Sequence, residues 1–240
     1  MNLSRPPQGH PVICQAGGSE AGWNLAAEYA DVMFSKSTAI GEARRFYKDI
    51  KSRMARFGRH PDQLKIMLEM RAVVGRTEQE AHEKFRAVQD MVTEAEAKDL
   101  LKQFLPGIDF TDCAMDEPIP NRPEIDAAAQ RFRVFVEKDG RRMTLRELTD
   151  TGFGSWILIG TAAQIADGLI EWFDNEAADG FMFTPHWLPG GLTDFVDMVV
   201  PELQARGVFR MAYEGNTLRE IMGFDRPAPR RASVRDCAAE

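Results

Sequence analysis

Short apolar runs and amphipathic stretches alternate along most of the chain. The runs are brief, rich in β-branched and aromatic residues, and bounded by glycine, proline or polar residues, which is typical of buried strands. They occupy residues 12–16, 31–35, 64–75, 156–159 and 180–184. Helical spacing of apolar residues follows the runs, most clearly from about 39 to 57. Strands that alternate with helices pair in parallel beneath them, so the pattern predicts an α/β fold.

Several helix boundaries are also indicated by local signals. Segments 77–80 (TEQE) and 161–164 (TAAQ) have the capping-box pattern and predict helix starts. Gly58 follows the long amphipathic stretch and predicts its end, because glycine readily adopts the left-handed conformation that closes a helix. Pro201 interrupts a helical stretch from 192 to 206 and predicts a break or a restart there.

The alternation fails between about residues 93 and 151. This segment contains four prolines and many charges, with one amphipathic helix near 125–136. It predicts a largely helical insertion outside the sheet, which either lines an active site or decorates the surface. We therefore expect one domain over residues 1–225 that includes this insertion. Residues 226–240 are rich in proline and arginine and predict a disordered tail.

Composition and charge narrow the class of protein. The 240 residues carry a net charge of −7, which is unsuited to binding nucleic acid through phosphate contacts. No apolar run approaches the roughly 18–20 residues of a membrane span, and the polar start lacks a signal-peptide core. Cys14, Cys113 and Cys237 are too few and too widely spaced for a disulfide framework or zinc site. We expect a cytoplasmic protein without nucleic-acid, membrane or metal partners, in which Cys14 is a small buried strand residue.

The first predicted strand ends in Gln15-Ala16-Gly17-Gly18-Ser19 and leads directly into a helix. A helix start presents unpaired backbone N–H groups and a favourable dipole to an anion. The glycines permit close approach, and Ser19 can both cap the helix and bind a phosphate. A tight turn closed by a serine cap is the alternative, and it remains open. Neither a Walker A nor a GxGxxG pattern is present, so ATP and classical dinucleotide binding are not supported.

Two further polar residues stand out next to the predicted strands. His186 follows the run at 180–184, and the carboxyl ends of parallel strands carry active sites. It is the candidate catalytic residue; the alternative is a histidine packed for structural reasons in a rigid proline- and glycine-rich loop. Glu69 lies inside the apolar run 64–75, and a buried carboxylate needs a partner. It either points into a barrel interior or marks an earlier end of the strand.

Several segments together resemble one protein family. The resemblance extends in register from about residue 10 to 226, and it is carried by QAGGSEAG (15–22), ADVMF (30–34), GRHPDQLK (58–65), VGRTEQEA (74–81), GT (160–161) with QIAD (164–167), ADGF (178–181), and LPGG (188–191) followed by VPEL (200–203). These segments match the pattern of the bacterial luciferase-like flavin monooxygenases. The likeness is to the branch that contains the nitrilotriacetate, EDTA and dibenzothiophene-sulfone monooxygenases.

The resemblance implies the C-terminal half of a TIM-type (β/α)8 barrel that binds reduced FMN and uses O2 as co-substrate. In that family the turn after the corresponding strand holds the FMN phosphate, which implies binding by Gly18 and Ser19. Gln15, Ala16 and Gly17 would line the approach to the phosphate. The implied partners are a separate flavin reductase, which supplies reduced FMN, and a small organic substrate. The protein would orient the flavin and exclude water from it.

The chain departs from the family pattern in three ways. It resembles only the C-terminal half of members about twice its length, whereas a complete TIM barrel needs about 250 residues. Gly18 replaces the first serine of the family turn, and His186 lies where relatives often have another residue. An open half-barrel exposes an apolar inner face and unpaired strand edges, beginning with residues 12–16. The outcomes left open are pairing with a complementary N-terminal half, self-association into a homo-oligomer, and poor solubility.

The predicted function is that of an FMN-dependent, two-component monooxygenase, of which this chain forms an incomplete C-terminal portion. The alternative is a non-catalytic remnant or assembly subunit of such an enzyme, because half of the barrel is missing. A flavin- or phosphate-binding module without oxygen chemistry is a third interpretation. The sequence does not identify the organic substrate.

Overall fold

The computed structural model describes residues 4–132, 136–138, 140–150 and 156–228. The chain divides into two compact units. Unit 1 comprises Met1–Met33, Ile50–Lys65 and Arg210–Glu240, and unit 2 comprises Phe34–Asp49 and Ile66–Phe209. Strand β2 (Val32–Ser35) and helix α2 (Ile40–Arg53) belong partly to each unit. Most of the tail predicted at 226–240 lies outside the described residues.

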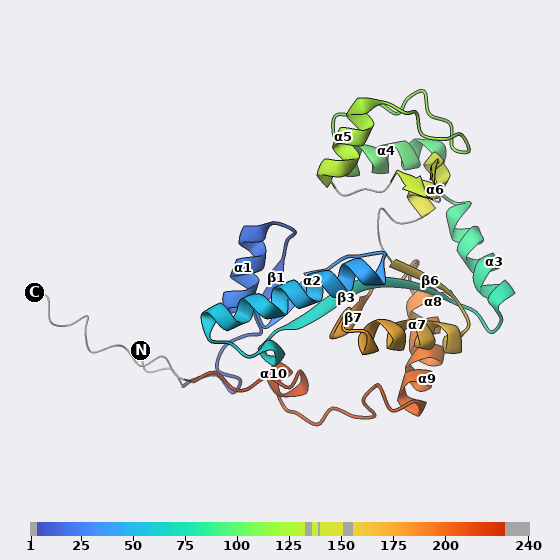
Figure 1. Cartoon of the computed structure of the whole chain (residues 1–240). Coiled ribbons are helices and arrows are strands. Elements are labelled where there is room, and N and C mark those ends of the chain that lie inside the picture. The colour runs from blue at the N-terminus through green and yellow to red at the C-terminus, as the bar shows by residue number, and fades with distance from the viewer. Residues whose placement is uncertain (1–3, 133–135, 139, 151–155, 229–240) are drawn as a thin grey trace, which may run out of the picture. The chain divides into compact units, whose positions relative to one another are not determined.

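Unit 2 is built on a parallel sheet (Figure 1). Its strands are β3 (Lys65–Val74), β6 (Trp156–Gly160) and β7 (Gly180–Phe183). The central strand β3 pairs in parallel with both of the others, and Met70 lies opposite Trp156 on one side and Phe183 on the other. The predicted α/β class with a parallel sheet is therefore confirmed.

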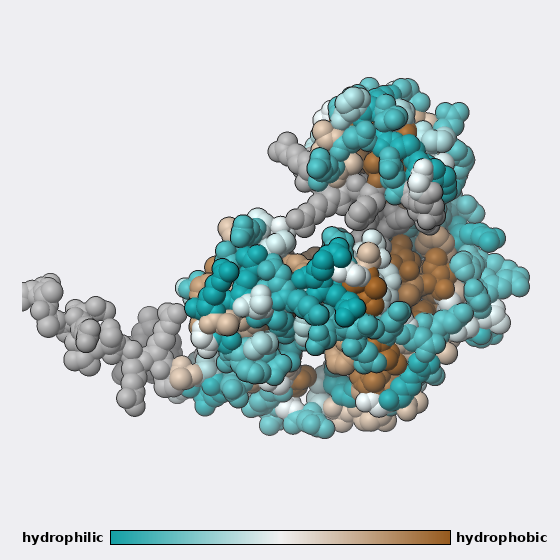
Figure 2. Space-filling model, in the orientation of Figure 1, coloured by the Kyte–Doolittle hydropathy of each residue, from teal (hydrophilic) through white to brown (hydrophobic). Residues whose placement is uncertain are grey.

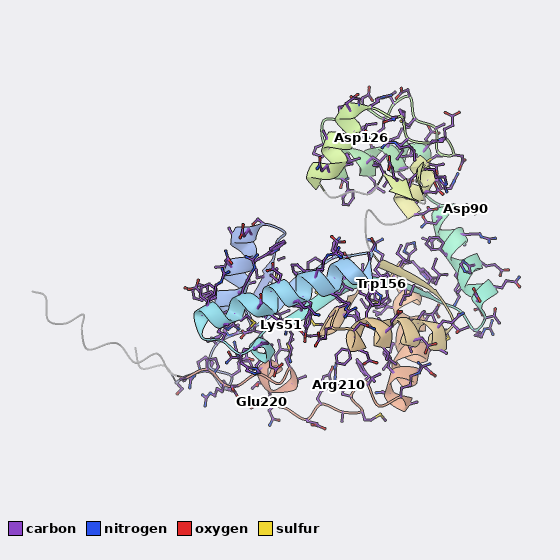
Figure 3. The ribbon with its side chains drawn as sticks, in the orientation of Figure 1. Lys51, Asp90, Asp126, Trp156, Arg210 and Glu220 are labelled. Carbon is purple, nitrogen blue, oxygen red and sulfur yellow. The ribbon has the colours of Figure 1, made fainter. Side chains whose placement is uncertain are left out.

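Helices cover one face of this sheet. They are α7 (Ala162–Asp174), α8 (Gly190–Asp194), a π-helix (Phe195–Val199) and α9 (Val200–Ala205). Met70, Ala72 and Val74 belong to one core with buried side chains of α7, the π-helix and α9, which are Ile165, Ala166, Leu169, Val199 and Leu203. Trp156, labelled in Figure 3, stacks on Trp172 of α7 with ring centroids 4.2 Å apart. Because side chains alternate along a strand, Glu69, Arg71 and Val73 occupy the opposite face of β3.

The π-helix lies where Pro201 predicts an interruption. Pro201 has no N–H and cannot donate to the carbonyl four residues earlier, so an ordinary helix is disfavoured at this point. The Val200 N–H donates instead to the Phe195 carbonyl, five residues earlier. The chain therefore stays helical through one wide turn, and the predicted restart takes the form of a change in helix type.

The two predicted capping boxes have different outcomes. At the start of α7, the Thr161 hydroxyl accepts from the Gln164 N–H and the Gln164 side chain accepts from the Thr161 N–H, so this box is confirmed. At the start of α3 (Glu78–Gln89), Thr77 accepts from the Glu80 N–H as predicted. The predicted reciprocal bond, from the Thr77 N–H to the Glu80 side chain, is wrong. The Glu80 carboxylate accepts from the backbone and side chain of Arg76 instead.

The segment between α3 and β6 forms its own group of elements. These are α4 (Glu94–Phe104), α5 (Pro123–Phe132), the paired strands β4 (Glu137–Lys138) and β5 (Arg141–Arg142), and α6 (Leu145–Asp150). A separate apolar core holds them, with fully buried members that include Ala97, Leu101, Leu105, Phe110, Ile125 and Leu145. The segment is helical for the most part, and it also contains a short hairpin. The domain limits given above stay predictions.

Unit 1 consists mainly of short elements. They are β1 (Cys14–Ala16), α1 (Glu20–Tyr29), 3-10 helices at Met54–Phe57 and Pro61–Gln63, and α10 (Leu218–Ile221). Gly58 has a φ of 65° and closes the helical segment before it, as predicted. The Arg59 guanidinium then donates to three carbonyls at the end of α1, those of Ala26, Ala27 and Ala30. The bonds to Ala27 and Ala30 satisfy acceptors that a helix end leaves without a helical partner, whereas the Ala26 carbonyl also accepts from the Ala30 N–H.

The cysteine prediction is wrong at Cys14, which is exposed in β1. Its neighbour Ile13 is also 43% exposed. An edge strand has a neighbour on one side only, so its apolar residues are left uncovered, as the half-barrel argument anticipated for 12–16. Within the described ranges, no helix has the length and apolarity to cross a bilayer, and no group of three or more potential metal-ligating side chains gathers.

A buried ion pair connects α10 with the first strands of unit 1. Arg219 is 3% exposed and donates to the Asp31 carboxylate and to the His10 carbonyl. The same Asp31 oxygen accepts from the Ile13 N–H at 2.8 Å. Removing one partner of a buried pair leaves the other charge uncompensated in a medium that solvates it poorly.

We therefore expect Arg219→Met to lower the free energy of unfolding by about 3–5 kcal/mol. Adding Asp31→Asn to this variant should recover part of the loss, because asparagine can still accept from Ile13 without a charge. Arg226→Met is the matched control, since Arg226 makes only an exposed bond to the Pro6 carbonyl. Urea denaturation followed by circular dichroism measures all three. Equal losses for Arg219→Met and Arg226→Met would contradict the role of the pair.

Candidate functional site

The end of β1 and the turn that leads into α1 contain all five residues predicted to contact a cofactor. Ser19 is the N-cap of α1, with an extended backbone, and its hydroxyl oxygen accepts from the Gly22 N–H at 3.1 Å. Gly17 has a φ of 151°, which a residue with a side chain rarely adopts. Ala16, Gly17, Gly18 and Ser19 are exposed, so no side chain covers the turn.

The helix start in this turn retains unused hydrogen-bond donors. The Trp23 N–H donates to the Ser19 carbonyl, and the Gly22 N–H donates to the Ser19 hydroxyl. For the N–H groups of Glu20 and Ala21, no acceptor is found among the residues that the structure describes. The hydroxyl proton of Ser19 also lacks an acceptor there and can donate. Two amides, one hydroxyl and the positive end of the helix dipole thus fit an anion such as a phosphate.

Close packing within unit 1 shapes this turn. A Cβ at Gly22 would lie 3.3 Å from the Ser19 hydroxyl oxygen and 3.4 Å from the Gln15 amide nitrogen, so glycine lets these groups approach the helix start. Glu20 carries a negative charge next to the exposed amides, and Arg53 lies 3.6 Å from its carboxylate and offsets that charge. The structure therefore brings Gln15, Ala16, Gly17, Gly18 and Ser19 together. Their role as cofactor ligands stays a prediction.

His186 lies in unit 2, two residues after the last backbone bond between β7 and β3. That bond runs from the Thr184 N–H to the Met70 carbonyl at 2.9 Å. The His186 ring lies 5.3 Å from the Phe85 ring of α3, and its Nε2 is 3.3 Å from the Gln89 amide nitrogen. Burial, and secondly the nearby charge of Arg71, lower the pKa of His186 below its usual value. A neutral, half-buried imidazole is the result.

The loop that carries His186 is held by its neighbours. Trp187 packs over the start of α8, where a Cβ at Gly190 would lie 2.7 Å from the indole nitrogen. The Leu188–Pro189 peptide is cis. The packing of Trp187 on α8 agrees with a histidine held in place by its loop, and a catalytic role for His186 stays a prediction.

The face of β3 that points away from the helices carries two charged residues. Glu69 is 6% exposed, and its Oε2 lies 2.6 Å from the Lys36 ammonium in an ionic contact whose angles fall outside those of a hydrogen bond. The expected partner of Glu69 is thus Lys36, just after β2. Arg71, two residues further along β3, is the residue that sequence reasoning missed. Its signal was present, because a second charge at i+2 in an apolar strand lies on the same face as the first.

Comparison with known proteins identifies the family. The family model described as luciferase-like monooxygenase matches residues 1–179. The chain belongs to the luciferase-like monooxygenase family. Members of this family are flavin-dependent monooxygenases that use reduced FMN and O2. The resemblance inferred from the QAGGSEAG and VGRTEQEA segments is therefore confirmed.

Individual relatives support the same placement. The chain is 42% identical to N-acetyl-S-(2-succino)cysteine monooxygenase of Bacillus subtilis (strain 168), covering 97% of this chain and 54% of that protein. It is 40% identical to nitrilotriacetate monooxygenase component A of Aminobacter aminovorans, with coverages of 95% and 51%. The chain thus spans about half the length of the curated relatives it matches.

Solved structures give the same coverage. The crystal structure of DmoA from Hyphomicrobium sulfonivorans matches with a TM-score of 0.76 and 28% identity, over 92% of this chain and 47% of that one. EDTA monooxygenase (EmoA) from Chelativorans sp. BNC1 matches with a TM-score of 0.67 and 30% identity, over 94% and 53%. The fold of the luciferase-like family is therefore present over about half of its length.

The environment of His186 makes a testable prediction. We expect its imidazole to titrate below pH 6.5 in NMR spectra of the ring nitrogens, because burial and the Arg71 cation both disfavour the protonated ring. Arg71→Gln removes the cation and should raise the pKa of His186, although it stays below its usual value because burial remains. Arg76→Gln, at an 83% exposed side chain just past β3, is the control and should leave the titration unchanged. Identical titration curves in all three proteins would contradict the proximity of Arg71.

Proposed function

We propose that this chain provides the flavin-phosphate site and part of the barrel of a two-component, FMN-dependent monooxygenase. The observation that carries the proposal is the β1–α1 turn. There the N–H groups of Glu20 and Ala21 and the Ser19 hydroxyl proton have no acceptor among the described residues. These groups suit the dianionic end of FMN, because charge-assisted hydrogen bonds at a helix start are strong. Membership in the luciferase-like family supports FMN over other phosphate compounds.

In this proposal the chain binds and orients the flavin, and the flavin supplies the oxygen chemistry when it is bound. Ser19 and the Glu20 and Ala21 amides hold the phosphate, while Gly17 and Gly18 allow the backbone to approach it. Gln15 and Ala16 line the approach. A flavin reductase would deliver reduced FMN, and a small organic molecule would be the substrate.

The exposed face of the sheet in unit 2 suits association with a further component. In unit 2 the face of the sheet opposite the helices is incompletely covered, and Met182 of β7 is 46% exposed. Figure 2 shows hydrophobic surface in the region where Figure 1 draws β6 and α8. An apolar face of this kind favours association with another chain. We infer that a complementary N-terminal half, or a second copy of this chain, completes a TIM-type barrel of which this chain is the C-terminal half.

The alternative is a non-catalytic remnant or assembly subunit of such an enzyme. The coverage of only about half of each relative favours it, because the missing half would contribute to the same barrel. In this case the turn is retained without turnover, and the exposed face serves association only. Oxygen chemistry and assembly are separable by experiment.

We expect FMN to bind more tightly than riboflavin, which lacks the phosphate, in titrations followed by flavin fluorescence. Ser19→Ala should weaken FMN binding by about 1–2 kcal/mol, the loss of one charge-assisted hydrogen bond, and should leave riboflavin binding unchanged. Thr77→Ala is the matched control, since Thr77 caps α3 with the same geometry. Equal effects on FMN and riboflavin would exclude Ser19 from a phosphate site.

The activity itself is tested by oxygen consumption. We expect the chain, mixed with a flavin reductase, NADH, FMN and a complementary N-terminal half, to consume O2 beyond the reductase alone. Native mass spectrometry of the same mixture reports whether the two halves, or two copies of this chain, assemble. Assembly without flavin-dependent O2 uptake would favour the assembly subunit. Absence of FMN binding in every combination would reject the flavin proposal.

A further inference from the structure

Arg71 lies in an unusual position for an arginine. It is on the sheet face of β3 that the helices do not cover, and its neighbour across the β3–β6 pairing is Ile157. Met182 of β7 is on the same face, opposite Glu69. On the two neighbouring strands this face therefore presents apolar side chains, Ile157 and Met182, which solvate a charge poorly.

The charge of Arg71 has no partner in the described part of the chain. Its Nε is buried and lacks a hydrogen-bond acceptor, and no ion pair involves this residue there. The one carboxylate near it along the strand, Glu69, is in contact with the Lys36 ammonium. A buried guanidinium nitrogen without an acceptor is costly unless a ligand supplies one.

His186 supplies a second donor near Arg71, because Thr184, two residues before His186, donates its N–H to the carbonyl of Met70, the residue before Arg71. An amide nitrogen can only donate, so the Gln89 amide donates to His186 Nε2, which must then be unprotonated. The neutral ring carries its proton on Nδ1, and Nδ1 is also buried without a partner. Gln89, which is 8% exposed, thus fixes the tautomer that turns Nδ1 into a donor.

We propose that Arg71 and His186 form a binding site for a carboxylate group of the organic substrate. A carboxylate has two oxygens and one negative charge, and it matches one cationic and one neutral donor whose hydrogens lack acceptors. The apolar residues of β6 and β7 would contact the carbon skeleton next to the carboxylate. His186 acts as a positioning donor in this arrangement, and Gln89 is the residue that orients it. The assignment to a substrate rests on the proposed function, whereas the anion site itself does not.

The test uses succinate as the probe, with its uncharged diamide as the control ligand, and needs no flavin. Binding to the 240-residue chain is followed by the NMR signals of the His186 ring. We expect succinate to shift the His186 signals in a saturable manner, and succinamide not to shift them. Arg71→Gln should weaken succinate binding at least tenfold, and His186→Gln about threefold or more. Arg71→Lys keeps the charge without the Nε donor and should give an intermediate affinity.

Controls separate this site from others. Arg76→Gln removes an exposed arginine that pairs with Glu80 and should change succinate affinity less than twofold. Inorganic phosphate is titrated in parallel, and tighter Arg71-dependent binding of phosphate than of succinate would overturn the carboxylate assignment. Equal responses to succinate and succinamide, or an unchanged affinity in Arg71→Gln and Arg71→Lys, would overturn the site. Succinate binding that survives in a protein unable to bind FMN would reject the proposed function alone.

Discussion

Strand β3 pairs with a neighbouring strand on each side, and its two faces carry very different side chains. Toward α7 and α9 it presents Met70, Ala72 and Val74, which fill an apolar core. Away from the helices it presents Glu69, Arg71 and Val73, so two of the three side chains are charged. Because side chains alternate strictly, the packing of the first set determines where the second set points. The chemistry of unit 2 therefore depends on the register of β3 with β6 and β7.

Both candidate sites hold hydrogen-bond donors in excess of acceptors, but for different physical reasons. At the β1–α1 turn the excess arises from backbone geometry, since every helix start leaves N–H groups that the helix cannot use. On the face of β3 away from the helices it arises from burial, because Arg71 Nε and His186 Nδ1 are shielded from water and have no acceptor among the described residues. An exposed backbone site suits a strongly charged phosphate that keeps part of its hydration. A half-buried side-chain site suits a smaller anion attached to an apolar body.

Much of this arrangement could be predicted from the sequence. Periodicity located β3, β6 and β7 but not the short hairpin of β4 and β5, and the TAAQ segment forms its capping box because Thr161 and Gln164 satisfy each other locally. The capping rule failed where a second local partner competes, as at Glu80, which binds Arg76, four residues earlier, instead of the Thr77 N–H. Cys14 was misplaced because burial of an edge strand depends on a neighbour that the run of residues does not reveal. The position of Arg71 on the same face as Glu69 could be predicted from the i+2 spacing, whereas the lack of an acceptor for its Nε is seen only in the structure.

The π-helix between α8 and α9 has a consequence for how unit 2 is closed. A wide turn accommodates one more residue than an ordinary one, and this shifts everything downstream by about 100° around the helix axis. Val199 and Leu203 face the sheet after this rotation, while Phe195 stacks on Phe183 with ring centroids 4.0 Å apart. Pro201 thus determines the rotation of the last helical segment about its axis. With this rotation, the apolar side chains of the segment pack against β3.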